Sequence, residues 1–116
     1  MKKPVPAYSG HEPFIFVSYS HADTAVVYPE IYRLQEMGFN VWYDEGIDAG
    51  DEWTQTLASA IVESVNCIYF VTPTSVRSEH CRREVSFAQS REKPVIAIHL
   101  IPTELPDGLQ LALGIR

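Results

Sequence analysis

Short apolar runs, separated by stretches with helical periodicity, constrain the fold of this chain more than any other feature. Unbroken runs of β-branched and aromatic residues are typical of strands buried on both faces, as in a parallel sheet, whereas strands with one face in water alternate polar and apolar residues. The runs are FIFVSY over 14–19, CIYFVT over 67–72, PVIAIHL over 94–100 and the shorter NVWYD over 40–44.

Helical spacing of apolar side chains marks the segments between these runs, over residues 24–37, 53–64 and 78–90. Pro29 lies inside the first segment, so that helix is expected to start near it or to bend there, and Gly38 is the expected stop. Strands that alternate with helices predict right-handed crossovers and an open parallel α/β sheet with helices on both faces.

The length of 116 residues fits one domain. A sheet of this kind usually has a fifth strand and a covering helix. We therefore expect a fifth strand to begin at 113–116 and the chain to be cut short before the C-terminal helix. Residues 1–12 contain two prolines, one glycine and no periodicity. They are expected to be a flexible N-terminal segment or linker, which leaves residues 13–116 for the domain.

Charge and composition exclude several classes of function. The net charge of −6 lacks the basic stripe that binds a nucleic-acid backbone, and no apolar run is long enough to cross a bilayer. The first residues lack the apolar region of a secretory signal, and Cys67 and Cys81 are too few for a disulfide framework. We therefore expect a cytoplasmic protein with reduced thiols that binds neither nucleic acid nor membrane.

Polar residues gather after the first three apolar runs. Open parallel sheets bind ligands beyond the carboxyl ends of their strands, so these residues are expected to share one crevice. Its candidate members are Ser20, His21, Asp44, Asp48, Trp53, Ser78 and Glu84.

Glu84 is the main candidate for chemistry. On a helix over 78–90 it lies about 60° from the inward face that contains Cys81 and Val85. At that border the carboxylate could be partly desolvated and close to backbone donors. It could equally be a solvated first-turn residue that the helix dipole favours. Cys81 falls on the inward face itself, which favours a buried, inert thiol.

Other candidates leave several interpretations open. Five carboxylates over 44–52 could form a solvated loop or a contact loop for a partner. Their spacing does not fit a calcium loop, so no metal site is expected. His21 and His80 could be acid–base groups, although neither has an obvious partner in the sequence. Phosphate-binding, dinucleotide-binding and nucleophile-elbow motifs are missing, so no prosthetic cofactor is expected.

Four motifs in a fixed order give the chain a family resemblance. They are FIFVSYSHAD at the first strand, L-x-x-x-G-F-N-V-W-Y-D over 34–44, I-D-A-G over 47–50 and S-x-x-C-x-x-E over 78–84. From Pro13 to about Arg116, the chain resembles a Toll/interleukin-1 receptor (TIR) domain of bacterial type. The resemblance implies a flavodoxin-like fold with a parallel sheet of order 2-1-3-4-5.

The resemblance also implies one of two activities. Many members cleave the nicotinamide–ribose bond of NAD, giving nicotinamide and ADP-ribose or a cyclic ADP-ribose, often in bacterial defence against phage. Other members only scaffold signalling through TIR–TIR contacts, and active members often work only as homo-oligomers or filaments. We expect an NAD glycohydrolase with NAD as substrate. One alternative is a self-association module, whose acidic loop would dock on Arg82, Arg83 and Arg91 of another copy. The other is a transferase of free nucleosides.

The resemblance also implies which residues of this chain form the site. Glu84 matches the catalytic glutamate, Ser20 and His21 match nucleotide-binding positions, and Asp48 matches an acidic binding position. Two further residues border the site by analogy, Trp53 and Ser78.

Two departures from the family concern affinity. His80 stands where many bacterial members have Trp, and His21 stands where an animal NAD-cleaving member has Arg. One carboxylate at Glu84 suffices for the implied chemistry, because nicotinamide leaves as a neutral base while positive charge develops on the ribose. A fixed anion beside that sugar can stabilise the charge.

Overall fold

The computed structural model describes residues 4–45, 51–105 and 107, and of residues 51–53 it describes only that they are helical. Within these ranges, one parallel sheet has the order β2-β1-β3-β4. Its strands are β1 (Ile15–Ser18), β2 (Val41–Tyr43), β3 (Asn66–Val71) and β4 (Val95–His99). The predicted flavodoxin-like order is confirmed for these strands. The fifth strand expected at 113–116 lies outside the described residues.

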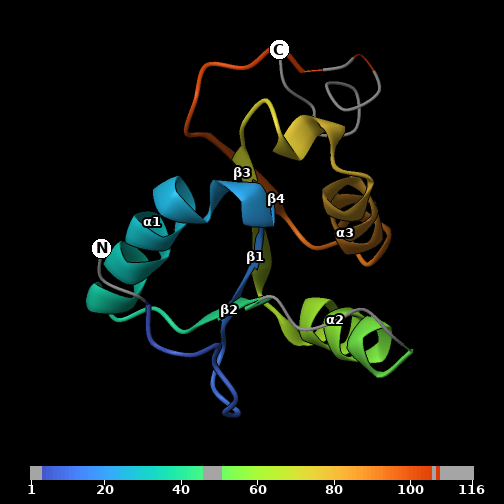
Figure 1. The fold of residues 1–116 in the computed structure, drawn as a ribbon. Coiled ribbons are helices and arrows are strands. Elements are labelled where there is room, and N and C mark those ends of the chain that lie inside the picture. The colour runs from blue at the N-terminus through green and yellow to red at the C-terminus, as the bar shows by residue number, and fades with distance from the viewer. Residues whose placement is uncertain (1–3, 46–50, 106, 108–116) are drawn as a thin grey trace.

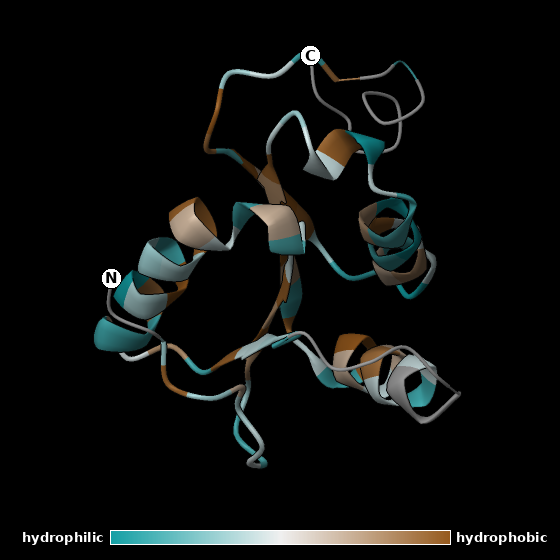
Figure 2. Ribbon diagram, in the orientation of Figure 1, coloured by the Kyte–Doolittle hydropathy of each residue, from teal (hydrophilic) through white to brown (hydrophobic). Residues whose placement is uncertain are grey.

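Helices cover both faces of this sheet, as predicted (Figure 1). The helix α1 (Thr24–Glu36) lies on one face, and α2 (Asp51–Glu63) and α3 (Glu79–Ser90) lie on the other. Short 3-10 turns, η1 (His21–Asp23) and η2 (Ser75–Arg77), precede α1 and α3. Figure 2 shows hydrophobic residues along the central strands and hydrophilic ones on the outer sides of the helices.

Packing around β1 explains why its run has no alternation. Ile15 and Val17 pack in one cluster with Ile31 of α1, whereas Phe16 packs on the opposite face with Leu57 of α2. Each fully buried aliphatic or aromatic side chain of this kind contributes about 1.5–3 kcal/mol. The central strand therefore needs apolar residues on both sides.

The structure of α1 tests the expectations about Pro29 and Gly38. It begins at Thr24 and continues through Pro29, so it does not start at that proline. Gly38 has a φ of +94°, and its N–H donates to the carbonyl of Gln35 at 3.0 Å. This left-handed conformation costs little only for glycine, so the predicted stop at Gly38 is confirmed.

The last described strand differs from the prediction. PVIAIHL reads as a strand buried on both faces, but Ile96 is 46% exposed and His99 is exposed as well. Among the described residues, β4 pairs with β3 alone. Its burial is therefore that of an edge strand, which apolar content by itself does not distinguish from a central one.

Part of the expected N-terminal linker contacts the domain. The N–H of Tyr8 donates to the carbonyl of Val41 at 2.9 Å, beside β2. The side chain of Gln35 accepts from the N–H of Val5 and donates to its carbonyl, at 2.9 and 3.0 Å. These hydrogen bonds fix residues 5–8 against β2 and α1.

The described part of the chain contains no helix long and apolar enough to span a membrane.

Candidate active site

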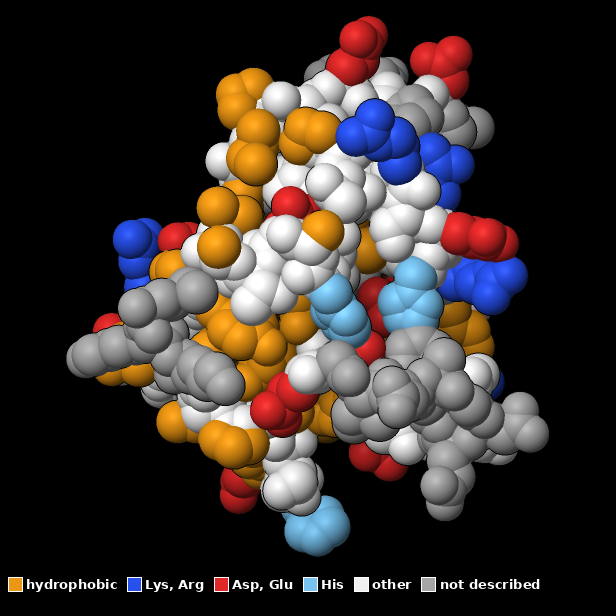
Figure 3. All heavy atoms as spheres, in the orientation of Figure 1, with side chains coloured by type: hydrophobic (Ala, Val, Ile, Leu, Met, Phe, Trp, Pro, Cys, Tyr) orange, Lys and Arg blue, Asp and Glu red, His pale blue; other side chains and the backbone are white. Residues whose placement is uncertain are grey.

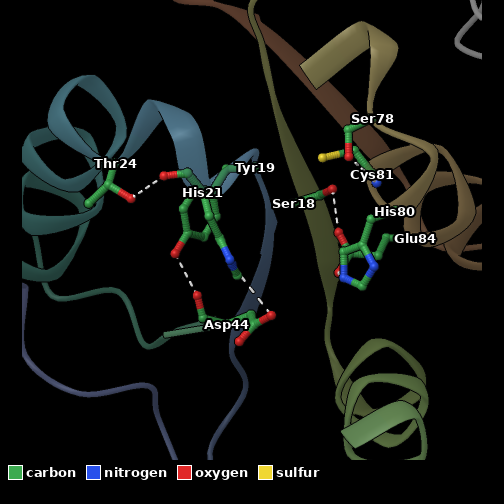
Figure 4. A network of polar contacts seen from close by, with 9 residues as sticks. All are labelled: Ser18, Tyr19, His21, Thr24, Asp44, Ser78, His80, Cys81 and Glu84. Atoms are coloured by element: carbon green, nitrogen blue, oxygen red, sulfur yellow. Dashed lines mark hydrogen bonds and ion pairs between the residues drawn. The ribbon is translucent and has the colours of Figure 1, made fainter. Parts of the chain in front are cut away.

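Polar side chains from distant parts of the sequence meet at the carboxyl ends of β1 and β2, beside the first turns of α3 (Figure 4). Ser18 ends β1, His21 begins η1, Asp44 directly follows β2, and His80 and Glu84 lie on α3. We call these five residues the carboxylate cluster. These side chains therefore meet at the edge where a parallel sheet binds ligands.

Glu84 is a buried carboxylate whose two oxygens lie against two different side chains of the cluster. Only 7% of the residue is exposed. The hydroxyl of Ser18 donates to Oε1 at 2.7 Å, and Nε2 of His80 lies 3.4 Å from Oε2. Of the two interpretations of Glu84, the solvated first-turn residue is therefore wrong. The inward face of α3 carries it among buried Cys81, Val85 and Ala88.

Burial changes the proton affinity of both members of this pair. It raises the pKa of Glu84 to about 8, since the carboxylate loses hydration, while the Ser18 hydrogen bond opposes the shift and the charge of Asp44 adds to it. At neutral pH the side chain therefore holds a proton most of the time. Burial also lowers the pKa of His80, so that its imidazole is neutral at pH 7.

A second histidine–carboxylate pair completes the cluster. Nε2 of His21 lies 3.4 Å from Oδ2 of Asp44, with the histidine side chain 45% exposed and the carboxylate 6% exposed. The hydroxyl of Tyr19 donates to the carbonyl of Asp44, and that of Thr24 donates to the carbonyl of His21. These bonds fix the ends of β2 and η1. Both histidines thus have partners that the sequence did not reveal.

The outer surface gives solvent access to the cluster. Figure 3 shows two histidine side chains next to each other on this face, with acidic atoms deeper between them. His21 and His80 are 45% and 41% exposed, whereas the carboxylates of Asp44 and Glu84 beneath are almost fully buried. The two imidazoles therefore form the solvent-facing side of the cluster, above two buried carboxylates.

The other predicted site residues have different outcomes. Ser78 caps α3, and its hydroxyl accepts from the N–H of Cys81 at 3.2 Å. Ser20 is half-buried before η1, and its carbonyl accepts from the N–H of Asp23. Asp48 lies outside the described residues. Trp53 is part of α2, but its side chain also lies outside the description.

The sequence interpretation missed Ser18. It is fully buried and touches Glu84 directly. Its signal was available, because it is a hydroxyl inside the otherwise apolar run FIFVSY. Buried hydroxyls need a hydrogen-bond partner, so such a residue at a strand end is a site candidate.

Cys81 has the environment predicted for it. It is fully buried, and burial raises the pKa of its thiol to about 11. The thiol therefore stays protonated and unreactive. Cys67 is also a buried free thiol.

Two grooves lie away from the carboxylate cluster. One, of about 370 Å³, lies between the N-terminal segment and α2 and includes Tyr8, Trp42 and Glu63. The other, of about 470 Å³, lies on the outer face of α3 and includes Arg82 and Phe87. Glu84 lines neither groove. Its candidacy therefore rests on its chemistry and not on groove size.

Metal binding has no support from the part of the chain that the structure covers. Within residues 4–45, 54–105 and 107, no group of three or more His, Cys, Asp or Glu side chains could hold a metal ion. Most of the acidic stretch over 44–52 lies outside these residues.

A parallel, flavodoxin-like α/β domain with a buried carboxylate at its strand ends is the class that the fold and the site define. The sequence matches the family model of the TIR domain over residues 15–115. The chain therefore belongs to the TIR domain family.

Solved structures agree with this fold. The TIR domain of the Toll-related receptor TRR-2 from Hydra magnipapillata is 19% identical with a TM-score of 0.71, over 83% of this chain and 77% of that one. The TIR domains of the activated Roq1 resistosome, which recognizes the pathogen effector XopQ, are 21% identical with a TM-score of 0.59. That match covers 76% of this chain and 56% of the other. No curated protein matches the sequence.

Proposed function

We propose that this TIR domain is an NAD glycohydrolase in which Glu84 is the catalytic carboxylate. The reaction breaks the bond between nicotinamide and ribose. Water then bonds to the ribose and releases a proton, which gives ADP-ribose, or a nitrogen of the adenine bonds there, which gives a cyclic ADP-ribose. The observation that carries the proposal is the buried carboxylate of Glu84 at the strand ends, held by Ser18 and beside His80.

The chemistry needs an anion and no acid. Nicotinamide is bound to ribose as a cation and leaves as a neutral base, so positive charge moves to the sugar as the bond breaks. A carboxylate withdrawn from water interacts strongly with that charge, and one such preorganised group is worth about 3–4 kcal/mol. Glu84 is withdrawn from water in this way.

The raised pKa of Glu84 is compatible with this role. Without ligand at pH 7 the side chain is mostly protonated. A cationic nicotinamide ring beside it favours the charged form, because opposite charges within about 4–6 Å lower the pKa of an acid. Substrate binding would therefore release the proton and form the anion where it is needed.

Other residues would bind the nucleotide. We assign this role to His21 and Ser20, to Asp48 and Trp53, and to Ser78, as the family resemblance implies. Of these, His21 has the firmest support, because Asp44 orients its half-exposed imidazole at the mouth of the cluster. A cytoplasmic location and a role in bacterial defence against phage belong to the same proposal.

Nicotinamide release at increasing protein concentrations tests the activity. We expect NAD cleavage to rise more steeply than protein concentration if assembly completes the site. The variant Glu84→Gln should keep the fold and lose turnover by about 10²–10³-fold. The matched control is Glu79→Gln, which removes a carboxylate from the exposed side of the same helix. Cleavage that survives in Glu84→Gln would remove Glu84 from this role, and cleavage of free nucleosides alone would favour the transferase.

Self-association is a second candidate function, which the outer face of α3 favours. Arg82 and Arg83 border the groove there beside Phe87, and the guanidinium of Arg91 lies 5.3 Å from the Phe87 ring centroid. Glu79 lines the same groove and pairs with Arg83 at 2.9 Å, so the arginines outnumber the acidic residue on this face. On a chain with a net charge of −6, the face could dock an acidic segment of a second copy. Sedimentation of the wild type and of Arg82→Glu/Arg83→Glu checks it. Equal association of both proteins would reject this face.

A further inference from the structure

The pairing of His80 with Glu84 carries an inference that rests on the proposed function and deepens it. We propose that His80 is a positioning residue for Glu84, which holds one oxygen of the carboxylate while the hydroxyl of Ser18 holds the other. The two contacts together would fix the plane of the carboxylate toward the sugar.

Each carboxylate oxygen has its own protein contact. Ser18 donates to Oε1 at 2.7 Å, and Nε2 of His80 lies 3.4 Å from Oε2. A carboxylate oxygen has two lone pairs, so each keeps capacity for a ribose hydroxyl. Because His80 and Glu84 are four residues apart on α3, the helix itself brings their side chains together.

A neutral imidazole can serve Glu84 in both of its charge states. With Glu84 ionised, the Nε2–H tautomer donates to Oε2. With Glu84 protonated, the other tautomer accepts the carboxyl proton at Nε2. The contact can therefore persist when substrate binding changes the charge. Burial keeps His80 in the required neutral form at pH 7.

The surrounding groups set the field in which this pair titrates. Asp44 after β2 interacts electrostatically with both members, His21 in η1 with His80, and Cys67 in β3 with Glu84. On α3 itself, Arg83 and Cys81 interact with one member each. Nε2 of His80 lies 3.4 Å from Oε2, and the hydroxyl of Ser18 donates to Oε1, so the two oxygens of the carboxylate have different neighbours.

A carbon-13 NMR titration of the Glu84 carboxyl group tests the proposal without any need for activity. The wild type is compared with His80→Phe, which keeps a ring without a donor, and with His80→Gln, whose amide can replace Nε2–H. Absence of the signal in Glu84→Gln assigns it. We expect His80→Phe to raise the midpoint by about half a pH unit or more, since the charged form loses a donor, and His80→Gln to restore most of it.

Kinetics then separates positioning from substrate contact. We expect His80→Phe to lower kcat about tenfold while KM changes less than about threefold, and His80→Gln to recover kcat. The control His99→Phe, on β4, should change neither quantity. If the phenylalanine variant does not fold by circular dichroism, His80→Leu takes its place.

Two results would overturn the proposal. One is a Glu84 midpoint that stays unchanged in a folded His80→Phe protein, and the other is an effect confined to KM. If the midpoint moves but the wild type never cleaves NAD, the pairing stands and the proposed function fails. If NAD is cleaved and the midpoint is unmoved, the proposed function stands and the positioning role fails.

Discussion

The helix α3 carries two side-chain pairs with the same spacing in opposite surroundings. Glu79 and Arg83 lie 2.9 Å apart on the outer face, with side chains 80% and 77% exposed. His80 and Glu84 lie 3.4 Å apart on the inner side, with side chains 41% and 8% exposed. Both pairs join residues i and i+4 on one helix, so the local geometry is shared.

The difference lies in access to water. An exposed pair exchanges its contacts with solvent and is worth about 0.3–0.5 kcal/mol on a helix. At Glu84, burial raises the pKa to about 8 and turns a surface residue type into a group that titrates near neutrality. Spacing on a helix thus creates a pair, whereas burial decides whether that pair has chemical consequences.

The largest expected contrast between the two glutamates is in stability against pH. Unfolded Glu84 loses its proton near its ordinary pKa of 4.5, whereas in the folded protein it keeps the proton up to about 8. The folded state therefore binds more protons between these values, and stability falls as pH rises through this window. Glu84→Gln avoids this loss. Above about pH 8, its free energy of unfolding should exceed that of the wild type by up to about 5 kcal/mol, relative to the difference between the two proteins at about pH 4.5.

Urea unfolding of both proteins across this pH range measures the contrast. Glu79→Gln is the control, and its stability should run parallel to that of the wild type between about pH 6 and pH 8, offset by no more than about 0.3–0.5 kcal/mol. A difference between Glu84→Gln and the wild type that does not change with pH would mean that Glu84 is solvated in the folded protein.

The next contrast is the pH dependence of NAD cleavage. If the ionised form of Glu84 is required, kcat/KM reports the ionisation of Glu84 in the protein without substrate. It should rise about 50-fold between about pH 6 and pH 8, then level off. The profile of kcat should lie at lower pH, because the bound cation favours the carboxylate. Initial rates of nicotinamide release, corrected for NAD breakdown without protein, provide both profiles. A flat kcat/KM profile would contradict the need for the anion.

Loss of the Ser18 contact should have a smaller effect. Ser18→Ala removes the donor to Oε1, so the pKa of Glu84 should rise and kcat/KM at about pH 7 should fall roughly tenfold. The deficit should shrink at about pH 9, where the carboxylate ionises in either protein. The control is Ser90→Ala, whose hydroxyl bonds a carbonyl at the exposed end of α3. A deficit that is the same at both pH values would assign Ser18 a purely structural role.

Much of the fold follows from the sequence. The unbroken runs fix β1 and β3 as buried strands, and helical spacing with Gly38 fixes α1 and its end. The exposure of β4 does not follow, because burial of an edge strand depends on its neighbours in the sheet and not on its own composition. The course of α1 through Pro29 does not follow either, since tertiary packing overrides a local helix breaker.

The site is predictable in part. Helical spacing places Glu84 at the border of an apolar face, and that position leaves both burial and solvation open. What decides between them is a hydroxyl 66 residues earlier in the chain, on a strand whose register brings Ser18 under α3. The contacts of Asp44 with His21 depend likewise on the pairing of β2 with β1. Such long-range pairings are set by the assembled sheet.

The smallest expected effect is the loss of the exposed pair between Glu79 and Arg83. Glu79→Gln removes the outer pair while Arg83 stays in water, so stability should fall by about 0.3–0.5 kcal/mol at low ionic strength. At about 1 M salt the loss should vanish, because screening already weakens the wild-type pair. Urea unfolding at both salt concentrations measures it, with NAD cleavage expected within about twofold of the wild type. A larger loss that salt does not reduce would show that solvent does not screen the outer pair. The contrast in exposure between the two faces of α3 would then no longer explain why Glu84 titrates near neutrality.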